Sequence, residues 1–180
     1  MKISSNKLKD IIDFAYQELE SLYEKNEIRS MIYSIIEHFT GYDLMKILTY
    51  KDELKVSESE LLKINFAIKD LKKERPLQQI LGYCEFLDVR IEVNQHVLIP
   101  RVETEEIVQR VIKENKGRKN LKIADICCGS GCIAIALKKA FPDANIYAYD
   151  ISEEALKKSK ENAEKNKEKI NFFKENILKS

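Results

Sequence analysis

What the sequence lacks already argues against several classes of protein. It has no apolar run of the roughly 20 residues that a transmembrane helix needs. Its opening residues, MKISSNKLKD, lack the apolar segment of a signal peptide. Neither sign of charge is in excess, because 31 basic residues stand against 30 acidic ones, for a formal net charge of +1. This balance gives no electrostatic reason to bind a nucleic-acid backbone, although it leaves room for a local basic patch. We therefore expect no membrane and no direct nucleic-acid partner.

Cysteine is also scarce, and its spacing is unfavourable for a disulfide framework. The four cysteines are Cys84, Cys127, Cys128 and Cys132. Three of them cluster and two are adjacent, which suits neither a set of disulfides nor the CxxC pair of a zinc site. The simplest interpretation is a reduced, cytoplasmic chain.

Residues 1–75 have the periodicity of helices alone. Hydrophobic residues make up 44% of the sequence, and here they form apolar stripes, from Leu8 to Leu22 on one helix and from Ile28 to Phe39 on the next. Gly41 stands where a helix would be capped. A short helix is expected at residues 44–48, and Ser57 begins a capping box for a further helix, which Pro76 should stop. The stripes indicate core packing in a small helical domain.

Residues 76–101 change to the period of two that is typical of strands. The alternation runs from Phe86 to Val93, and residues 97–99 follow after a polar turn. We interpret this segment as a β-hairpin that links two domains. Pro100 ends it, and Glu103 or Thr104 should begin a helix.

From residue 102 onward the sequence predicts the first part of an α/β domain. Strands are expected at 121–126, 145–149 and 170–174, with helices at 131–140 and 152–167. This alternation predicts a parallel sheet with crossover helices, and right-handed crossovers give the strand order 3-2-1.

The most informative motif lies where the first of these strands meets its helix. The strand ends near Asp125, and a turn through Gly129, Ser130 and Gly131 leads into a helix whose N-terminal N–H groups would face a ligand. Asp150 ends the next strand, where a carboxylate can accept hydrogen bonds from both hydroxyls of a ribose. The spacing indicates a nucleoside-binding site.

Three interpretations of this motif are open. The residues Gly129-x-Gly131-x-x-Ala134 fit a dinucleotide fingerprint. Asp125 favours S-adenosylmethionine instead, because a carboxylate at the strand tip suits an α-ammonium group and would repel a pyrophosphate. A structural turn without a ligand is the third interpretation. Cys127 and Cys128 could be metal ligands or nucleophiles, but no histidine is near them in sequence, so we expect small side chains that fill the loop and no metal.

Residues 74–111 carry a far more specific pattern. They read ERPLQQILGYCEFLDVRIEVNQHVLIPRVETEEIVQRV, and they closely resemble the linker of the release-factor glutamine methyltransferases, the PrmC/HemK family. The helical first 75 residues also fit that family, so the resemblance covers essentially the whole chain. It implies a helical substrate-recognition domain (1–75), a hairpin linker (76–101) and the N-terminal part of a Rossmann-like class I methyltransferase domain (102–180).

The resemblance also implies a function. The reaction would be methyl transfer from S-adenosylmethionine to the side-chain amide nitrogen of the glutamine in the Gly-Gly-Gln motif of peptide chain release factors, in translation termination. The family's cofactor loop maps onto residues 127–131, its ribose-binding acid onto Asp150, and an aromatic residue that often follows the third strand onto Ile177. Ile177 and Asn176 depart from the aromatic and acidic residues that are usual there.

One family motif has no counterpart in these 180 residues. It is the catalytic Asn-Pro-Pro-Tyr that follows the fourth strand, and without it we assign no catalytic residue. We expect this chain alone to be inactive, because positioning of the nucleophile supplies much of the rate. We also expect its open sheet edge to favour self-association. The alternatives are a non-catalytic module that binds cofactor or protein, and a nucleic-acid adenine methyltransferase.

Overall fold

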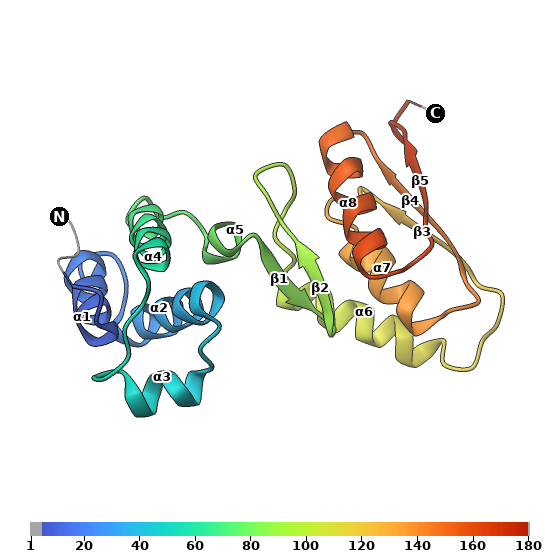
Figure 1. The fold of residues 1–180 in the computed structure, drawn as a ribbon. Helices are drawn as coiled ribbons and strands as arrows, with labels where there is room; N and C mark the ends of the chain where they lie inside the picture. Colours follow the sequence, from blue (N-terminus) through green and yellow to red (C-terminus); the bar gives the residue numbers. More distant parts are fainter. Residues whose placement is uncertain (1–4, 180) are drawn as a thin grey trace. The chain divides into compact units, whose positions relative to one another are not determined.

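The computed structural model describes residues 5–179, and its internal contacts divide the chain into two units after Leu81. The first unit is helical and the second is α/β (Figure 1). Among the described residues, no helix is both long and apolar enough to cross a membrane. The predicted fold class, a helical bundle followed by an α/β domain, is confirmed.

The first unit contains five helices among its described residues: α1 (Leu8–Leu19), α2 (Lys25–Thr40), α3 (Leu44–Tyr50), α4 (Glu58–Leu71) and α5 (Leu77–Leu81). Their apolar stripes form one core, with Ile11, Ile32 and Ile64 among its fully buried members. Each helix can therefore be stable in this context, since packing of an apolar face rather than propensity supplies most helical stability.

Two predicted helix caps are confirmed, but two predicted helix ends are wrong. Gly41 caps α2 in the left-handed region with φ of 70°, and Ser57 and Glu60 form the capping box of α4. Leu22 does not extend the stripe of α1: the helix ends at Leu19, and Leu22 is 43% exposed in the following turn. Nor does Pro76 stop α4, which ends at Leu71, before a turn in which Glu74 has φ of 57°.

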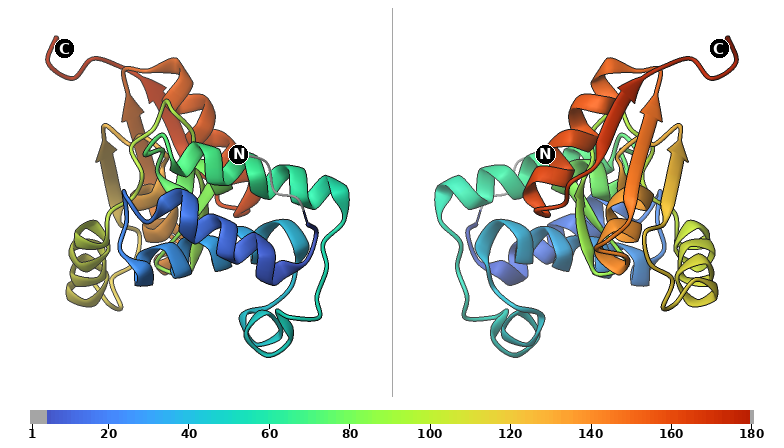
Figure 2. Two further views of the ribbon diagram at one scale, coloured as in Figure 1. Left: turned by 90° about the vertical axis from the view of Figure 1, so that its left-hand side faces the viewer. Right: turned by 90° about the vertical axis from the view of Figure 1, so that its right-hand side faces the viewer.

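The second unit is built around a parallel sheet of three strands, β3 (Lys122–Ile126), β4 (Asn145–Asp150) and β5 (Asn171–Lys174). Their arrowheads point the same way in Figure 2. Central β4 pairs with both others, so the predicted order 3-2-1 is confirmed. The crossovers are α7 (Cys132–Ala140) and α8 (Glu153–Lys165), and α6 (Val102–Glu114) precedes the sheet and packs beside α7.

A two-stranded hairpin begins this unit, but its strands lie earlier in the sequence than predicted. Its strands are β1 (Tyr83–Phe86) and β2 (Val89–Glu92), joined through Leu87 and Asp88, which both have positive φ. Positive φ at both central residues is the geometry of a type I′ turn, normally signalled by Asn-Gly or Asp-Gly. Because neither residue is a glycine, the sequence pattern did not predict a turn there. Residues 97–99, predicted as the second strand, form no strand, and Leu98 is 73% exposed.

The hairpin belongs to the second unit rather than forming a separate linker. Strand β2 contacts both α7 and α8. Phe86, Val89 and Ile91 are buried in the same core as Ala134 and Ile135 of α7. The second unit thus has three layers: the sheet, helices α7 and α8, and the hairpin over those helices. Burial of the hairpin's apolar residues requires a partner surface. Helix α7, which follows the glycine-rich loop, supplies part of that surface.

Candidate cofactor site

The candidate site lies at the carboxyl ends of β3 and β4, where ligands of open α/β sheets bind. The loop 127–131 leaves the end of β3 and leads into the first turn of α7. Asp150 is the last residue of the neighbouring strand β4. Register pairs Asp125 with Ala148 and Ile126 with Tyr149, so both strands end side by side. The structure therefore brings Asp125, the loop and Asp150 to one edge of the sheet.

The loop backbone is tightly folded and needs glycine at one position in particular. Gly131 has φ of 79°, and a Cβ atom there would lie 2.9 Å from Cβ of Ser159 on α8. Cys127 also has a positive φ, of 61°. Two backbone hydrogen bonds fix the turn, from the N–H of Cys128 to the carbonyl of Tyr149 at 2.9 Å and from the N–H of Gly131 to the carbonyl of Cys128 at 2.8 Å. Only glycine can follow this path so close to α8.

Asp150 ties the loop to the next helix. Its Oδ2 accepts a hydrogen bond from the N–H of Gly129 at 2.9 Å, and its Oδ1 accepts one from the N–H of Ser152, also at 2.9 Å. Ser152 in turn caps α8 by accepting from the N–H of Ala155. Each carboxylate oxygen can accept a further hydrogen bond. Asp150 is only partly buried, so it can hold the loop and still accept hydroxyl groups from a ligand.

Asp125 is placed differently. It is 7% exposed, and its Oδ2 accepts the N–H of Ala134 inside the first turn of α7 at 3.1 Å. Burial raises the pKa of this carboxyl group from 3.8 to about 6; the hydrogen bond from Ala134 opposes the rise and the charge of Asp150 adds to it. Asp125 thus lies beneath the loop, facing the helix. An approaching positive charge would stabilise its ionised form.

The cysteines of the loop do not share one environment. Cys127 is exposed, whereas Cys128 and Cys132 are buried. Burial raises the pKa of the Cys128 thiol to about 12 and that of Cys132 to about 11. Both are neutral thiols near pH 7, unsuited to act as nucleophiles. Within the described chain, no group of three or more His, Cys, Asp or Glu side chains is arranged to hold a metal ion.

Ile177 lies after β5, at the same end of the sheet. The N–H of Glu175 donates to the carbonyl of Asp150 at 3.1 Å, which leads the chain past the end of β4. Ile177 follows in a turn and is 43% exposed. Asn176 accepts from the N–H of Leu178 with its side-chain oxygen, so it shapes this turn.

Sequence reasoning missed the contribution of α8. Ser159 and Asn162 lie on its buried face, each 0% exposed, among Ala155, Leu156 and Ala163. Ser159 packs against Gly131, and Asn162 donates to the carbonyl of Ser130 at 2.9 Å. Polar residues within an apolar helical stripe were the available signal, since buried polar groups are normally hydrogen-bonded.

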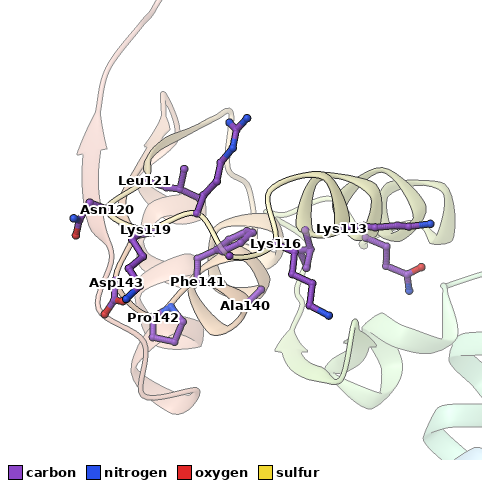
Figure 3. Close-up of a pocket in the computed structure, with 14 residues that line it drawn as sticks. Lys113, Lys116, Lys119, Asn120, Leu121, Ala140, Phe141, Pro142 and Asp143 are labelled. Carbon is purple, nitrogen blue, oxygen red and sulfur yellow. The ribbon is translucent and has the colours of Figure 1, made fainter.

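An open cavity of about 670 Å³ lies at the other edge of the sheet, away from the loop. It is lined by the end of α6, the loop before β3 and the turn after α7. Phe141 lies between Lys116 and Lys119 in this lining (Figure 3). The lining includes four cationic residues, Lys113, Lys116, Arg118 and Lys119, and the acidic Asp143. None of the predicted site residues lines this cavity.

Comparison with known proteins shows which family this chain resembles. Residues 103–180 match the family described as the methyltransferase small domain. The release factor glutamine methyltransferase of Flavobacterium psychrophilum is 42% identical over 168 residues, which cover 91% of this chain and 58% of that protein. The protein of the same name from Bacteroides thetaiotaomicron is 36% identical, over 93% of this chain and 59% of its own length. The chain thus spans somewhat more than half the length of these relatives. Over that span, helical unit and α/β unit included, it belongs to the family of release factor glutamine methyltransferases.

Proposed function

We propose that the protein to which this chain belongs transfers a methyl group from S-adenosylmethionine to the glutamine side chain of the Gly-Gly-Gln motif in a peptide chain release factor. The observation that carries the proposal is the pair of strand-end carboxylates, Asp125 and Asp150, on either side of a loop that only glycine can form at Gly131. Family membership selects the reaction and the class of substrate.

In this proposal the loop and Asp150 hold the nucleoside part of the cofactor. Hydroxyl groups of the ribose donate to Asp150, whose two oxygens keep accepting capacity beyond the N–H groups of Gly129 and Ser152. The backbone of residues 127–131 and the N-terminus of α7 surround the methionine part. Ile177 supplies apolar contact at the far side of the same edge.

Asp125 would interact electrostatically with the α-ammonium group of the cofactor. Its pKa of about 6 means that a nearby cation favours the ionised form and lowers that pKa. Cofactor affinity should therefore fall as the pH drops through about 6, because binding must then remove a proton.

The chemistry itself is a displacement at carbon. S-adenosylmethionine, when bound, would supply a methyl group on a sulfonium sulfur. The glutamine amide nitrogen would take this methyl group, with loss of one proton from the nitrogen to solvent, and S-adenosylhomocysteine would be the other product. Holding the two reactants in line supplies much of the rate in such a transfer.

The test is methyl transfer by the full-length protein. Purified release factor and S-adenosylmethionine with a tritiated methyl group are incubated with the enzyme, and label should enter the factor at the Gly-Gly-Gln glutamine. A factor with asparagine in place of that glutamine is the control, and it should stay unlabelled. Equal labelling of both factors would refute the proposed acceptor, while labelling of neither would refute the activity.

A further inference from the structure

Asn162 of α8 uses its whole side-chain amide inside the protein. Its Oδ1 accepts the N–H of Glu92 on β2 at 2.9 Å, and its Nδ2 donates to the carbonyl of Glu92 at 3.0 Å and to the carbonyl of Ser130 at 2.9 Å. The residue is 0% exposed. An amide has two donor hydrogens, so both are committed, one to the hairpin and one to the glycine-rich loop.

The contact with β2 is the pairing that a neighbouring strand would make. In an antiparallel hairpin, alternate residues direct their N–H and carbonyl groups away from the partner strand. Glu92 is such a residue, and Asn162 satisfies both of its groups. One helical turn later, Asn166 donates to the carbonyl of Arg90 at 2.9 Å. Two asparagines, Asn162 of α8 and Asn166 at its C-terminal cap, therefore bond to the outer edge of β2, but of the two only Asn162 also reaches the loop.

The hairpin has other attachments to the same helix. Lys158 lies 3.6 Å from Glu92, and Lys165 is also paired with that carboxylate. Apolar residues of both strands are buried in the core beneath. Loss of the Asn162 side chain would therefore leave the hairpin in place. The group that would lose its buried partner at the loop is the carbonyl of Ser130, a residue only 2% exposed.

We propose that Asn162 is a positioning residue for the cofactor: it fixes the loop 127–131 through the carbonyl of Ser130 and couples that loop to the hairpin. The inference rests on the proposed function, because it assumes that this loop binds the S-adenosyl group. The loop holds Cys127, which is not a glycine, at φ of 61°, a conformation that persists only when its surroundings determine it. The hydrogen bond from Asn162 to Ser130 supplies part of this constraint from α8, beside the contacts of Ser159 with Gly131 and with the thiol of Cys128.

The experiment compares Asn162→Ala with Asn166→Ala in the full-length protein. Asn162→Ala removes two hydrogen bonds to Glu92 of β2 and the bond to Ser130. Asn166→Ala removes one bond to Arg90 of β2 and one to the carbonyl of Asn162, and leaves Ser130 bonded. Calorimetric titration with S-adenosylhomocysteine should show about tenfold weaker binding for Asn162→Ala and less than about twofold for Asn166→Ala, the size expected when a buried carbonyl loses its donor. If Asn162→Ala does not fold, Asn162→Leu replaces it, because leucine branches at the same carbon, leaves no cavity and has no donor for Ser130.

Hydrogen exchange of the ligand-free protein provides a readout that needs no ligand. Amides of residues 128–132 should exchange faster in Asn162→Ala than in the wild type, and at the wild-type rate in Asn166→Ala. Equal losses of affinity in the two variants, or unchanged exchange in the loop of Asn162→Ala, would overturn the inference. A wild-type protein that does not bind S-adenosylhomocysteine would overturn the proposed function instead, and the exchange data would still decide whether Asn162 fixes the loop.

Discussion

The two edges of the parallel sheet differ in what they offer a ligand. The carboxyl edge presents a tight loop, the N-terminus of α7 and two carboxylates, Asp125 and Asp150, engaged with backbone N–H groups. The amino edge, where the strands begin, presents the open cavity beside Phe141, with four cationic residues in its lining. Ample space thus lies at one edge, and convergent hydrogen-bonding groups lie at the other. The chemistry of the backbone at the strand ends, rather than the size of a cavity, locates the candidate site.

Glycine substitutions at the two edges should give the largest contrast. Gly131 and Gly117 both have positive φ, of 79° and 84°, but an added Cβ meets Ser159 at 2.9 Å only at Gly131. Gly117→Ala should cost about 1–2 kcal/mol of unfolding free energy from backbone strain alone. Gly131→Ala should cost about 2–5 kcal/mol, because overpacking adds about 1–3 kcal/mol. Urea unfolding of both variants measures the difference. Equal losses would mean that α8 does not constrain the loop.

The buried carboxylate of Asp125 should make stability depend on pH at the carboxyl edge. Its folded pKa, about 6, is raised above the ordinary 3.8, so the folded state binds the proton more tightly. Stability from this group is therefore full below pH 4 and is lost as the pH rises through 6, by up to about 3 kcal/mol. Asp125→Asn should lack this loss, so the variant should gain stability relative to the wild type between pH 4 and 7. Thermal unfolding across that range tests it, and a constant difference between the two proteins would contradict it.

Asp150→Ala should weaken cofactor binding by about 1.5–3 kcal/mol, the range for hydrogen bonds to charged groups. Asp143→Ala, in the lining of the amino-edge cavity, is the matched control and should leave affinity unchanged. Calorimetric titration of the full-length protein with S-adenosylhomocysteine separates them. Unchanged affinity in Asp150→Ala would remove the ribose assignment.

The smallest effect is expected at the cations of the amino edge. Lys116→Ala and Lys119→Ala remove charge from the rim of that cavity, and each should change the unfolding free energy by less than about 0.5 kcal/mol, as surface substitutions usually do. Their affinity for S-adenosylhomocysteine should equal that of the wild type in the same titration. A marked loss of affinity would mean that these lysines take part in binding S-adenosylhomocysteine, which would contradict a site at the carboxyl edge.

Local patterns made much of the second unit predictable. The strands, the crossover helices and their order follow from periodicity and from the handedness of crossovers. Gly131 and Asp150 could be chosen because a tight turn and a strand-end carboxylate are signalled by residue type and spacing. The capping box at Ser57 was predictable for the same reason, since both of its partners lie within one helical turn.

The features that the sequence did not reveal depend on contacts between distant segments. Asn162 bonds to Glu92, 70 residues away, and to Ser130, 32 residues away, and no local pattern encodes such pairs. The turn through Leu87 and Asp88 lacks the usual glycine, so burial of the flanking strands overrides the turn preference there. Leu22 continues an apolar stripe in sequence, but the helix that carries the stripe ends before it.

The candidate cofactor site is tested by mapping where S-adenosylhomocysteine binds. Hydrogen exchange of the full-length protein, with and without saturating S-adenosylhomocysteine, reports on both edges in one measurement. We predict slower exchange in residues 127–132 and 150–152, and unchanged exchange in residues 113–121 and 140–144 of the amino edge. Protection confined to the amino edge, with the loop unaffected, would contradict the account.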